Sequence, residues 1–290
     1  MAAVADILEN IDSLPALPTS VMRITAMLSD GTSDLGEIEN VARNDEALSM
    51  AIMRYGNSAL YGRSGKVFNL RESIVRLGGK ALLKIVLEQK VAKLFDGAGE
   101  AYGLQRGDLW RGAVGGAIAA EEIAKKHRFG EADLCFLCGM LRDVGKLAME
   151  SHFGTEYMAQ VFARMEPGLT FMECEQSAFG TEHAEVGAEL ALRWGLPERI
   201  ADAIRYHHEP PAEDPGHDRL FDIVHAADII CLWAGLAIGS DGLQYKLAPH
   251  VRKDLGLDRK EAEAEITTTW GRLRELEEMM GTSPAREARA

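Results

Sequence analysis

The sequence has little of what marks secreted, membrane-spanning or nucleic-acid-binding proteins. Its 290 residues hold only four cysteines, too few for a disulfide framework. No apolar run approaches the roughly 20 residues needed to cross a bilayer. The first ten residues contain Asp6 and Glu9 and no basic stretch ahead of an apolar one, so no secretory signal is expected. Basic residues are in deficit, 32 against 45 acidic ones, which gives a net charge of −13. This charge repels phosphate groups, so we expect no nucleic-acid or membrane partners. Because neither a membrane span nor a secretory signal is expected, the predicted location is the cytoplasm.

The cysteines include one pair with the spacing of a redox or zinc motif. Cys135 and Cys138 lie inside the apolar stretch 134–141, with no second pair and no strand pattern beside them. This setting predicts buried helical thiols instead of a reactive pair.

What the sequence does have is helical periodicity. Leu48, Ile52 and Tyr55 form one apolar stripe at a spacing of three to four residues. Asn69 with Glu72, and Thr170 with Glu173, have the spacing of capping boxes. No run of alternating apolar and polar residues is convincing, so the prediction is an all-α fold.

Breaks in this pattern predict the organisation of the chain. Residues 96–107 carry four glycines and interrupt the helices, which separates an N-terminal helical lobe, 1–97, from a second lobe, 107–235. Residues 236–290 are predicted to be a C-terminal helical extension with a frayed tail, packed across one lobe or supporting a dimer. We expect the two lobes to pack closely.

Motifs in both lobes resemble those of HDOD-domain proteins, relatives of the HD phosphohydrolases. The matching stretches in the first lobe are 14–18, 44–45, 57–62 and 73–78, and those in the second are 109–111, 136–146, 183–187, 194–197, 203–208 and 224–228. The resemblance covers roughly residues 10–235. It implies an all-helical, mostly bacterial signalling family without demonstrated hydrolysis, in which the second lobe is HD-like.

The same resemblance indicates that one metal site is lost. In the catalytic relatives, a His following the Leu-Trp-Arg-like segment, a His-Asp pair and a late Asp hold the first metal. This chain has Gly112 and Arg142 in place of the two histidines, and keeps only Asp143 and Asp228. A guanidinium has no free lone pair and cannot ligate a metal. We hypothesise that Arg142 places a cation near the position of that metal.

The resemblance leaves a second set of ligands in place. Asp143, His183, His207 and His208 match positions that hold the second metal of binuclear relatives, and three imidazoles with a carboxylate suit one divalent ion such as iron, manganese or zinc. Lys146 and Asp228 would then lie beside this remnant site.

The alternative is that these polar residues are hydrogen-bonded between helices. His207 and His208 diverge by about 100° on a regular helix, so both ligate only if the helix ends there. The remaining histidines have no visible partners and are expected at the surface; they are His127, His152, His217 and His250.

Residues 209–218 lack the Gly-Tyr-Pro motif of cyclic-di-GMP hydrolases, so that activity is not expected. Two candidate functions are left. The first reading is a non-catalytic bacterial signal-transduction or scaffold protein. Its expected partners are signalling proteins, a phosphorylated small ligand and a second copy of the chain. The alternative is a metal-dependent phosphodiesterase with a reduced one-metal site.

Overall fold

The computed structural model describes residues 2–9, 39–40, 42–43, 46–58, 66–95, 98–212, 217–240 and 245–280. Within these ranges every regular element is a helix, which confirms the all-α prediction. The motif stretches 14–18 and 44–45 and the tail 281–290 lie outside the described residues. None of the helices in the described ranges is long and apolar enough to span a membrane.

The chain divides into two compact units, which we describe separately. One comprises Met1–Leu14 with Phe95–Arg274, and the other Pro15–Leu94 with Glu275–Ala290. The predicted ranges 1–97, 107–235 and 236–290 stay a prediction. α1 (Ala2–Glu9) packs on α8 and α11 of the HD-like unit, and residues 236–274 belong to that unit as well.

The smaller unit contains α4 (Glu46–Gly56) and α5 (Leu70–Phe95). The Asn69 side chain accepts a hydrogen bond from the backbone N–H of Glu72 at 2.8 Å, as the capping pattern predicts. Gly78 has a φ of 72°, which kinks α5.

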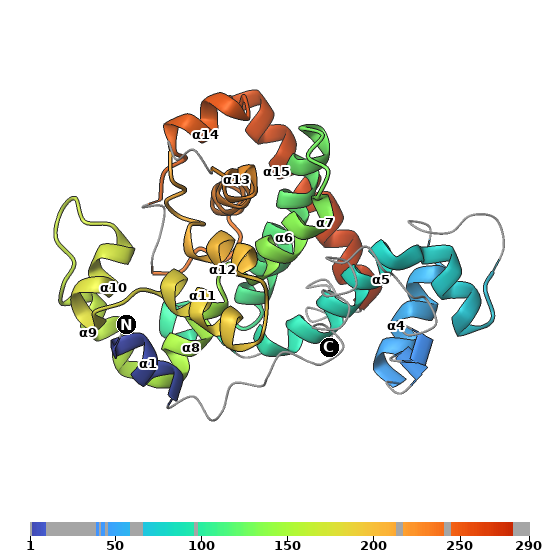
Figure 1. Cartoon of the computed structure of the whole chain (residues 1–290), viewed down its shortest axis with the longest axis horizontal. Coiled ribbons are helices and arrows are strands. Elements are labelled where there is room, and N and C mark those ends of the chain that lie inside the picture. Colours follow the sequence, from blue (N-terminus) through green and yellow to red (C-terminus); the bar gives the residue numbers. More distant parts are fainter. Residues whose placement is uncertain are drawn as a thin grey trace, which may run out of the picture. The chain divides into compact units, whose positions relative to one another are not determined.

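The larger unit is built around α6, α7 and α13, which pack on one another (Figure 1). α8 packs on α11, and α11 on α12. The helices of this unit that follow α1 are α6 (Asp108–Lys126), α7 (Ala132–Leu141), α8 (Val144–Phe153), α9 (Tyr157–Phe162), α10 (Phe171–Phe179), α11 (His183–Arg193), α12 (Glu198–Arg205), α13 (Arg219–Trp233) and α14 (Pro249–Asp254), with short 3-10 turns at Glu100–Tyr102 and Gly154–Glu156. The last helix, α15 (Arg259–Met280), begins in this unit.

α15 packs back on the larger unit. The indole Nε1 of Trp270 donates to the carbonyl oxygen of Ala234 at 3.0 Å. Arg272 Nη1 lies 3.1 Å from Glu121 Oε2 on α6. These contacts hold α15 against α6 and against the residue that follows α13.

Helix ends place the polar residues of interest. α7 ends at Leu141 and α8 begins at Val144, so Arg142 and Asp143 occupy the junction. α12 ends at Arg205, and His207 and His208 follow it outside the helix. The ending that both histidines need in order to face one point is therefore present.

Candidate functional site

The structure brings all seven predicted site residues into one buried cluster of the larger unit. Their exposed fractions are at most 6%. They come from the α7–α8 junction, the start of α8, the first residue of α11, the segment after α12 and the middle of α13, and are Arg142, Asp143, Lys146, His183, His207, His208 and Asp228.

Arg142 lies at the centre of one half of this cluster with its guanidinium fully engaged. Nε donates to Asp228 Oδ1 at 2.7 Å, and Nη2 lies 3.1 Å from Asp143 Oδ2. Nη1 donates to the backbone carbonyls of Gly112 and Gly139 at 2.9 and 2.8 Å. These four contacts engage all three nitrogens of the guanidinium, as a buried charge requires.

Glycines on α6 make room for this arginine. A Cβ atom at Gly116 would lie 2.1 Å from Arg142 Nη1. A Cβ at Gly112, where the relatives have a histidine, would lie 2.5 Å from the Cβ of Ala237. The space that a histidine would need is therefore filled from both sides.

Charges in this half of the cluster balance. Lys146 Nζ lies 2.9 Å from Asp143 Oδ1, so two cations face the carboxylates of Asp143 and Asp228. Burial alone would raise the pKa of Asp143, but Lys146 and Arg142 hold it well below its ordinary value. Burial is likewise outweighed at Asp228, whose pKa Arg142 and His208 lower. Both carboxylates are thus ionised, and their charge is neutralised by protein cations.

The other half of the cluster is organised by a glutamate that the sequence reasoning missed. Glu175, fully buried on α10, lies 2.6 Å from His183 Nδ1 and accepts the backbone N–H of His183 at 3.1 Å. The hydroxyls of Tyr102 and Tyr157 also donate to it. Burial lowers the pKa of His183, but the contacts with Glu175 raise it by more, so the pKa lies above its ordinary value. A Glu eight residues before a His gives no signal in sequence that the two will meet.

His207 and His208 complete this half. His207 Nδ1 lies 2.6 Å from the carbonyl oxygen of Ile204, so Nδ1 carries the proton and Nε2 keeps its lone pair. His208 Nε2 lies 2.9 Å from His183 Nε2, and its Nδ1 lies 3.2 Å from Asp228 Oδ2. Burial, then the neighbouring His208, lower the pKa of His207 well below its ordinary value.

The residues present fit one metal ion and not two. One ligand atom from each of His183, His207 and His208 lies within 4.8 Å of the others. The buried His207 Nε2 makes no hydrogen bond and lies 4.0 Å from Asp143 Oδ1. These atoms could hold one metal ion. Arg142 occupies the other half, where Gly112 contributes no ligand, so a second ion has no place there.

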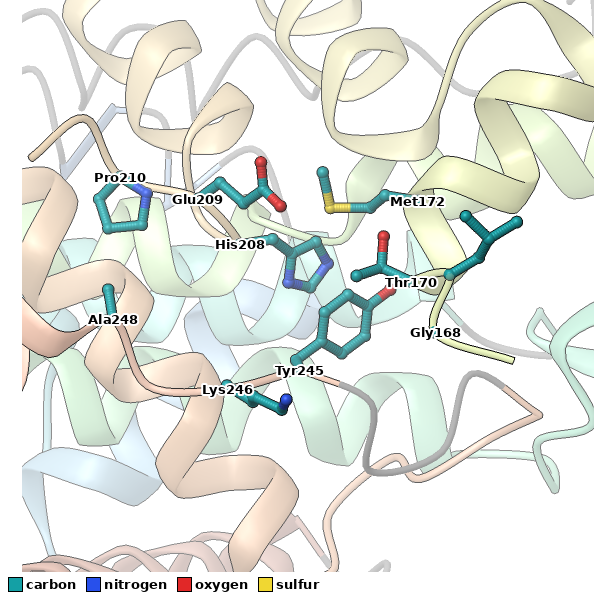
Figure 2. A pocket seen from close by; sticks show the side chains of 10 residues that line it. Gly168, Thr170, Met172, His208, Glu209, Pro210, Tyr245, Lys246 and Ala248 are labelled. Atoms are coloured by element: carbon teal, nitrogen blue, oxygen red, sulfur yellow. The ribbon is translucent and has the colours of Figure 1, made fainter. Parts of the chain in front are cut away.

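A cavity of about 520 Å³ opens beside His208. Figure 2 shows the ring of Tyr245 lying along that of His208, with Thr170 and Met172 of α10 across from them. The two stacked rings have centroids 3.8 Å apart and an interplanar angle of 2°. Lys246 gives the wall a positive charge, and Glu209 a negative one. His208 therefore belongs both to the buried cluster and to a pocket large enough for a small ligand.

The expectation that His217 and His250 are surface residues without partners is wrong. His217 Nε2 lies 2.8 Å from Asp222 Oδ2, and His250 Nε2 lies 3.4 Å from Asp222 Oδ1. Their side chains are 23% and 20% exposed, while that of Asp222 is 3% exposed. The three residues are separated by up to 33 positions in sequence, so spacing could not indicate the cluster.

Comparison with known proteins gives a family and a fold. The family model of the HDOD domain matches residues 14–210. A solved HDOD domain protein of unknown function from Geobacter sulfurreducens is 28% identical, with a TM-score of 0.71 over 93% of this chain and 88% of that one. A Marinobacter aquaeolei VT8 structure, whose description proposes a signal transduction role, is 21% identical, with a TM-score of 0.74 over 97% of this chain and 64% of that one.

Two further similarities complete the comparison. A Shewanella amazonensis SB2B structure, whose description proposes a phosphohydrolase, is 22% identical, with a TM-score of 0.63 over 91% of this chain and 98% of that one. An uncharacterized protein of Treponema pallidum (strain Nichols) is 25% identical over 228 residues, 78% of this chain. This chain spans only 43% of that relative's length.

Proposed function

The chain belongs to the HDOD domain family, and from this premise we propose that it is a non-catalytic module of bacterial signal transduction. In this proposal Arg142 takes over the electrostatic role of the catalytic metal, and the HD-like unit binds signalling partners or a phosphorylated small ligand without hydrolysing it. The fold would then preserve a recognition surface after its chemistry was lost.

The observation that carries the proposal is the placement of the Arg142 guanidinium between the two surviving carboxylates. It contacts Asp228 at 2.7 Å and Asp143 at 3.1 Å. A hydrolytic metal in this position would bind those carboxylates and activate a water molecule. A guanidinium can neutralise them, but it has no coordination position to offer to water.

Charge balance supports the same reading. The carboxylates of Asp143 and Asp228 face the cations of Arg142 and Lys146, so a divalent ion added to this half would meet a neutral site with no vacant ligand. Because desolvation of an ion is costly, such a site does not favour metal uptake.

The pocket beside His208 is where we place ligand recognition. It has a volume of about 520 Å³ and a lysine in its wall. A phosphorylated ligand could contact Lys246 and stack against Tyr245, whose ring already lies flat on His208 (Figure 2). Ligand binding there would alter the Tyr245–His208 stack and so reach the buried cluster.

The alternative is a phosphohydrolase with one metal, and the histidine cluster favours it. His183, His207 and His208 could hold the ion, with Glu175 orienting His183. A bound metal would supply a water of lowered pKa and a Lewis acid for the phosphoryl oxygen.

A single comparison separates the two functions. The purified chain is assayed with manganese, iron or zinc against phosphodiester and phosphomonoester substrates, beside the variants Asp143→Asn and His183→Gln. We expect no turnover above that of either variant. The same variants are tested for complementation of a deletion strain, and a signalling role without hydrolysis predicts that folded His183→Gln restores the phenotype. Metal-dependent turnover that both variants abolish would overturn the proposal.

A further inference from the structure

We propose that His217, Asp222 and His250 form a second site for a divalent transition metal, of the kind that zinc occupies. The site is separate from the His183–His207–His208 cluster and does not depend on the function proposed above. It fastens the first turn of α14 to the first turn of α13.

The geometry is that of an open metal site. One ligand atom of each residue lies within 4.8 Å of the other two. The imidazole Nε2 atoms of His217 and His250 lie 2.8 and 3.4 Å from the Asp222 carboxylate oxygens. Zinc bonds of about 2.0–2.1 Å in tetrahedral geometry place ligand atoms roughly 3.3 Å apart, so small side-chain movements suffice.

The carboxylate of Asp222, in the first turn of α13, is buried beside two imidazoles. Its side chain is only 3% exposed, and among the residues that the structure describes no lysine or arginine pairs with it. Its Oδ1 and the facing Nε2 of His250 are buried and make no hydrogen bond. A buried carboxylate between two imidazoles is costly unless a cation compensates it.

Two imidazoles and one carboxylate also select the class of ion. Imidazole suits zinc, copper, iron and nickel, whereas calcium and magnesium prefer all-oxygen ligands. The partial exposure of both histidine rings leaves a side open to solvent, so water can complete the coordination. Zinc is therefore the first choice.

The position of the site gives it a consequence. Three positions further along α13, His225 accepts a hydrogen bond from the backbone N–H of Ala248 at 2.9 Å, and its Nδ1 lies 2.9 Å from the carbonyl oxygen of His207. Ala248 and Tyr245 line the pocket beside His208. A metal bound by His250 would therefore hold the pocket wall in place.

The test uses the full chain, stripped with a chelator and titrated with zinc or cobalt alone. Wild type is compared with His217→Gln/His250→Gln and with the single variant His250→Gln, and His183→Gln serves as the matched control at the other cluster. The readouts are metal equivalents per chain, cobalt absorption and the shift of Tm on zinc addition.

We expect the double variant to bind one equivalent fewer than wild type, and His250→Gln to weaken that equivalent by at least about 100-fold. His183→Gln should keep the cobalt spectrum of the site, and the His217 and His250 variants should melt close to wild type in chelator. Equal stoichiometry and affinity in wild type and the double variant would overturn the proposal. So would loss of all bound metal in His183→Gln alone.

Discussion

Arg142 Nε donates to Asp228 Oδ1 over 2.7 Å, joining the α7–α8 junction to the middle of α13. Both side chains are at most 4% exposed. The contact links two positions 86 residues apart, and it lies where the catalytic relatives of the family have a metal. The folding stability of this protein should therefore depend on the positive charge of Arg142, in the place where a catalytic relative would have the charge of a metal ion.

The first prediction concerns the loss of that charge. Arg142→Met should lower the free energy of unfolding by about 3–5 kcal/mol, because it leaves a carboxylate buried without its cation. Urea unfolding followed by circular dichroism measures the change. The double variant Arg142→Met/Asp228→Asn should recover part of the loss, since the uncompensated charge is then gone.

Arg259 provides the control for this experiment. It pairs with Glu263 in an exposed position of α15, so Arg259→Met should unfold close to wild type. A small effect of Arg142→Met, equal to that of Arg259→Met, would contradict the structural role of the buried guanidinium.

A second prediction tests the space at the lost histidine position. Gly112→Ala should destabilise the chain by about 1–3 kcal/mol, because the new Cβ would lie 2.5 Å from that of Ala237. Ala237 has a φ of 53°, which glycine adopts more readily. Ala237→Gly should therefore be neutral or stabilising alone, and should rescue Gly112→Ala.

Thermal unfolding of wild type, the two single variants Gly112→Ala and Ala237→Gly, and the double variant measures the coupling free energy between the two positions. Gly271→Ala, at a helical glycine whose Cβ would meet nothing within 4 Å, is the matched control and should stabilise α15 slightly. Additive effects of Gly112→Ala and Ala237→Gly would mean that the two positions do not compete for space.

Much of the site could be predicted from the sequence because it follows local signals. The capping pattern of Thr170 and Glu173 is a complete capping box in the structure. α12 ends before the adjacent histidines, which is the condition for both to ligate, and this ending brings His207 and His208 beside His183. The family resemblance supplied the rest of the cluster, residue by residue.

The parts that could not be predicted depend on packing between distant segments. Glu175 reaches His183 only because the turn between α10 and α11 folds the carboxylate back onto the ring. Asp222 meets His250 only because α14 packs on α13. Neither contact has a spacing rule, since the participating helices are positioned by their apolar faces and not by these polar groups.

A third prediction concerns the thiols. Burial raises the pKa of Cys231 to about 12, and it also raises the pKa values of Cys135 and Cys138 above their ordinary range. Because the thiolate is the reactive form, these thiols should not react with Ellman's reagent in the native protein at pH 8. Unfolding in guanidinium should expose them. Rapid disulfide formation between Cys135 and Cys138 in the folded chain would contradict the interpretation as inert buried thiols.

The last prediction concerns pH. His225 Nε2 accepts the N–H of Ala248, which requires the neutral ring, while Nδ1 donates to the carbonyl oxygen of His207. Burial is the main reason that the pKa of His225 lies below its ordinary value. As the pH falls below about 6.5, His225 therefore binds a proton in the unfolded chain before it does so in the folded chain. The stability due to neutral His225 is present above that pH and is lost as the pH falls toward the folded pKa.

His225→Gln keeps an acceptor near Ala248 but cannot titrate. The difference in unfolding free energy between wild type and His225→Gln, measured in chelator from pH 7.5 to 5.5, should shift against wild type with a slope of at most about 1.4 kcal/mol per pH unit. His183 and His207 also titrate, but they are common to both proteins and largely cancel in the difference. Parallel stability curves would show that His225 has the same pKa folded and unfolded, and that its link between His207 and Ala248 survives protonation.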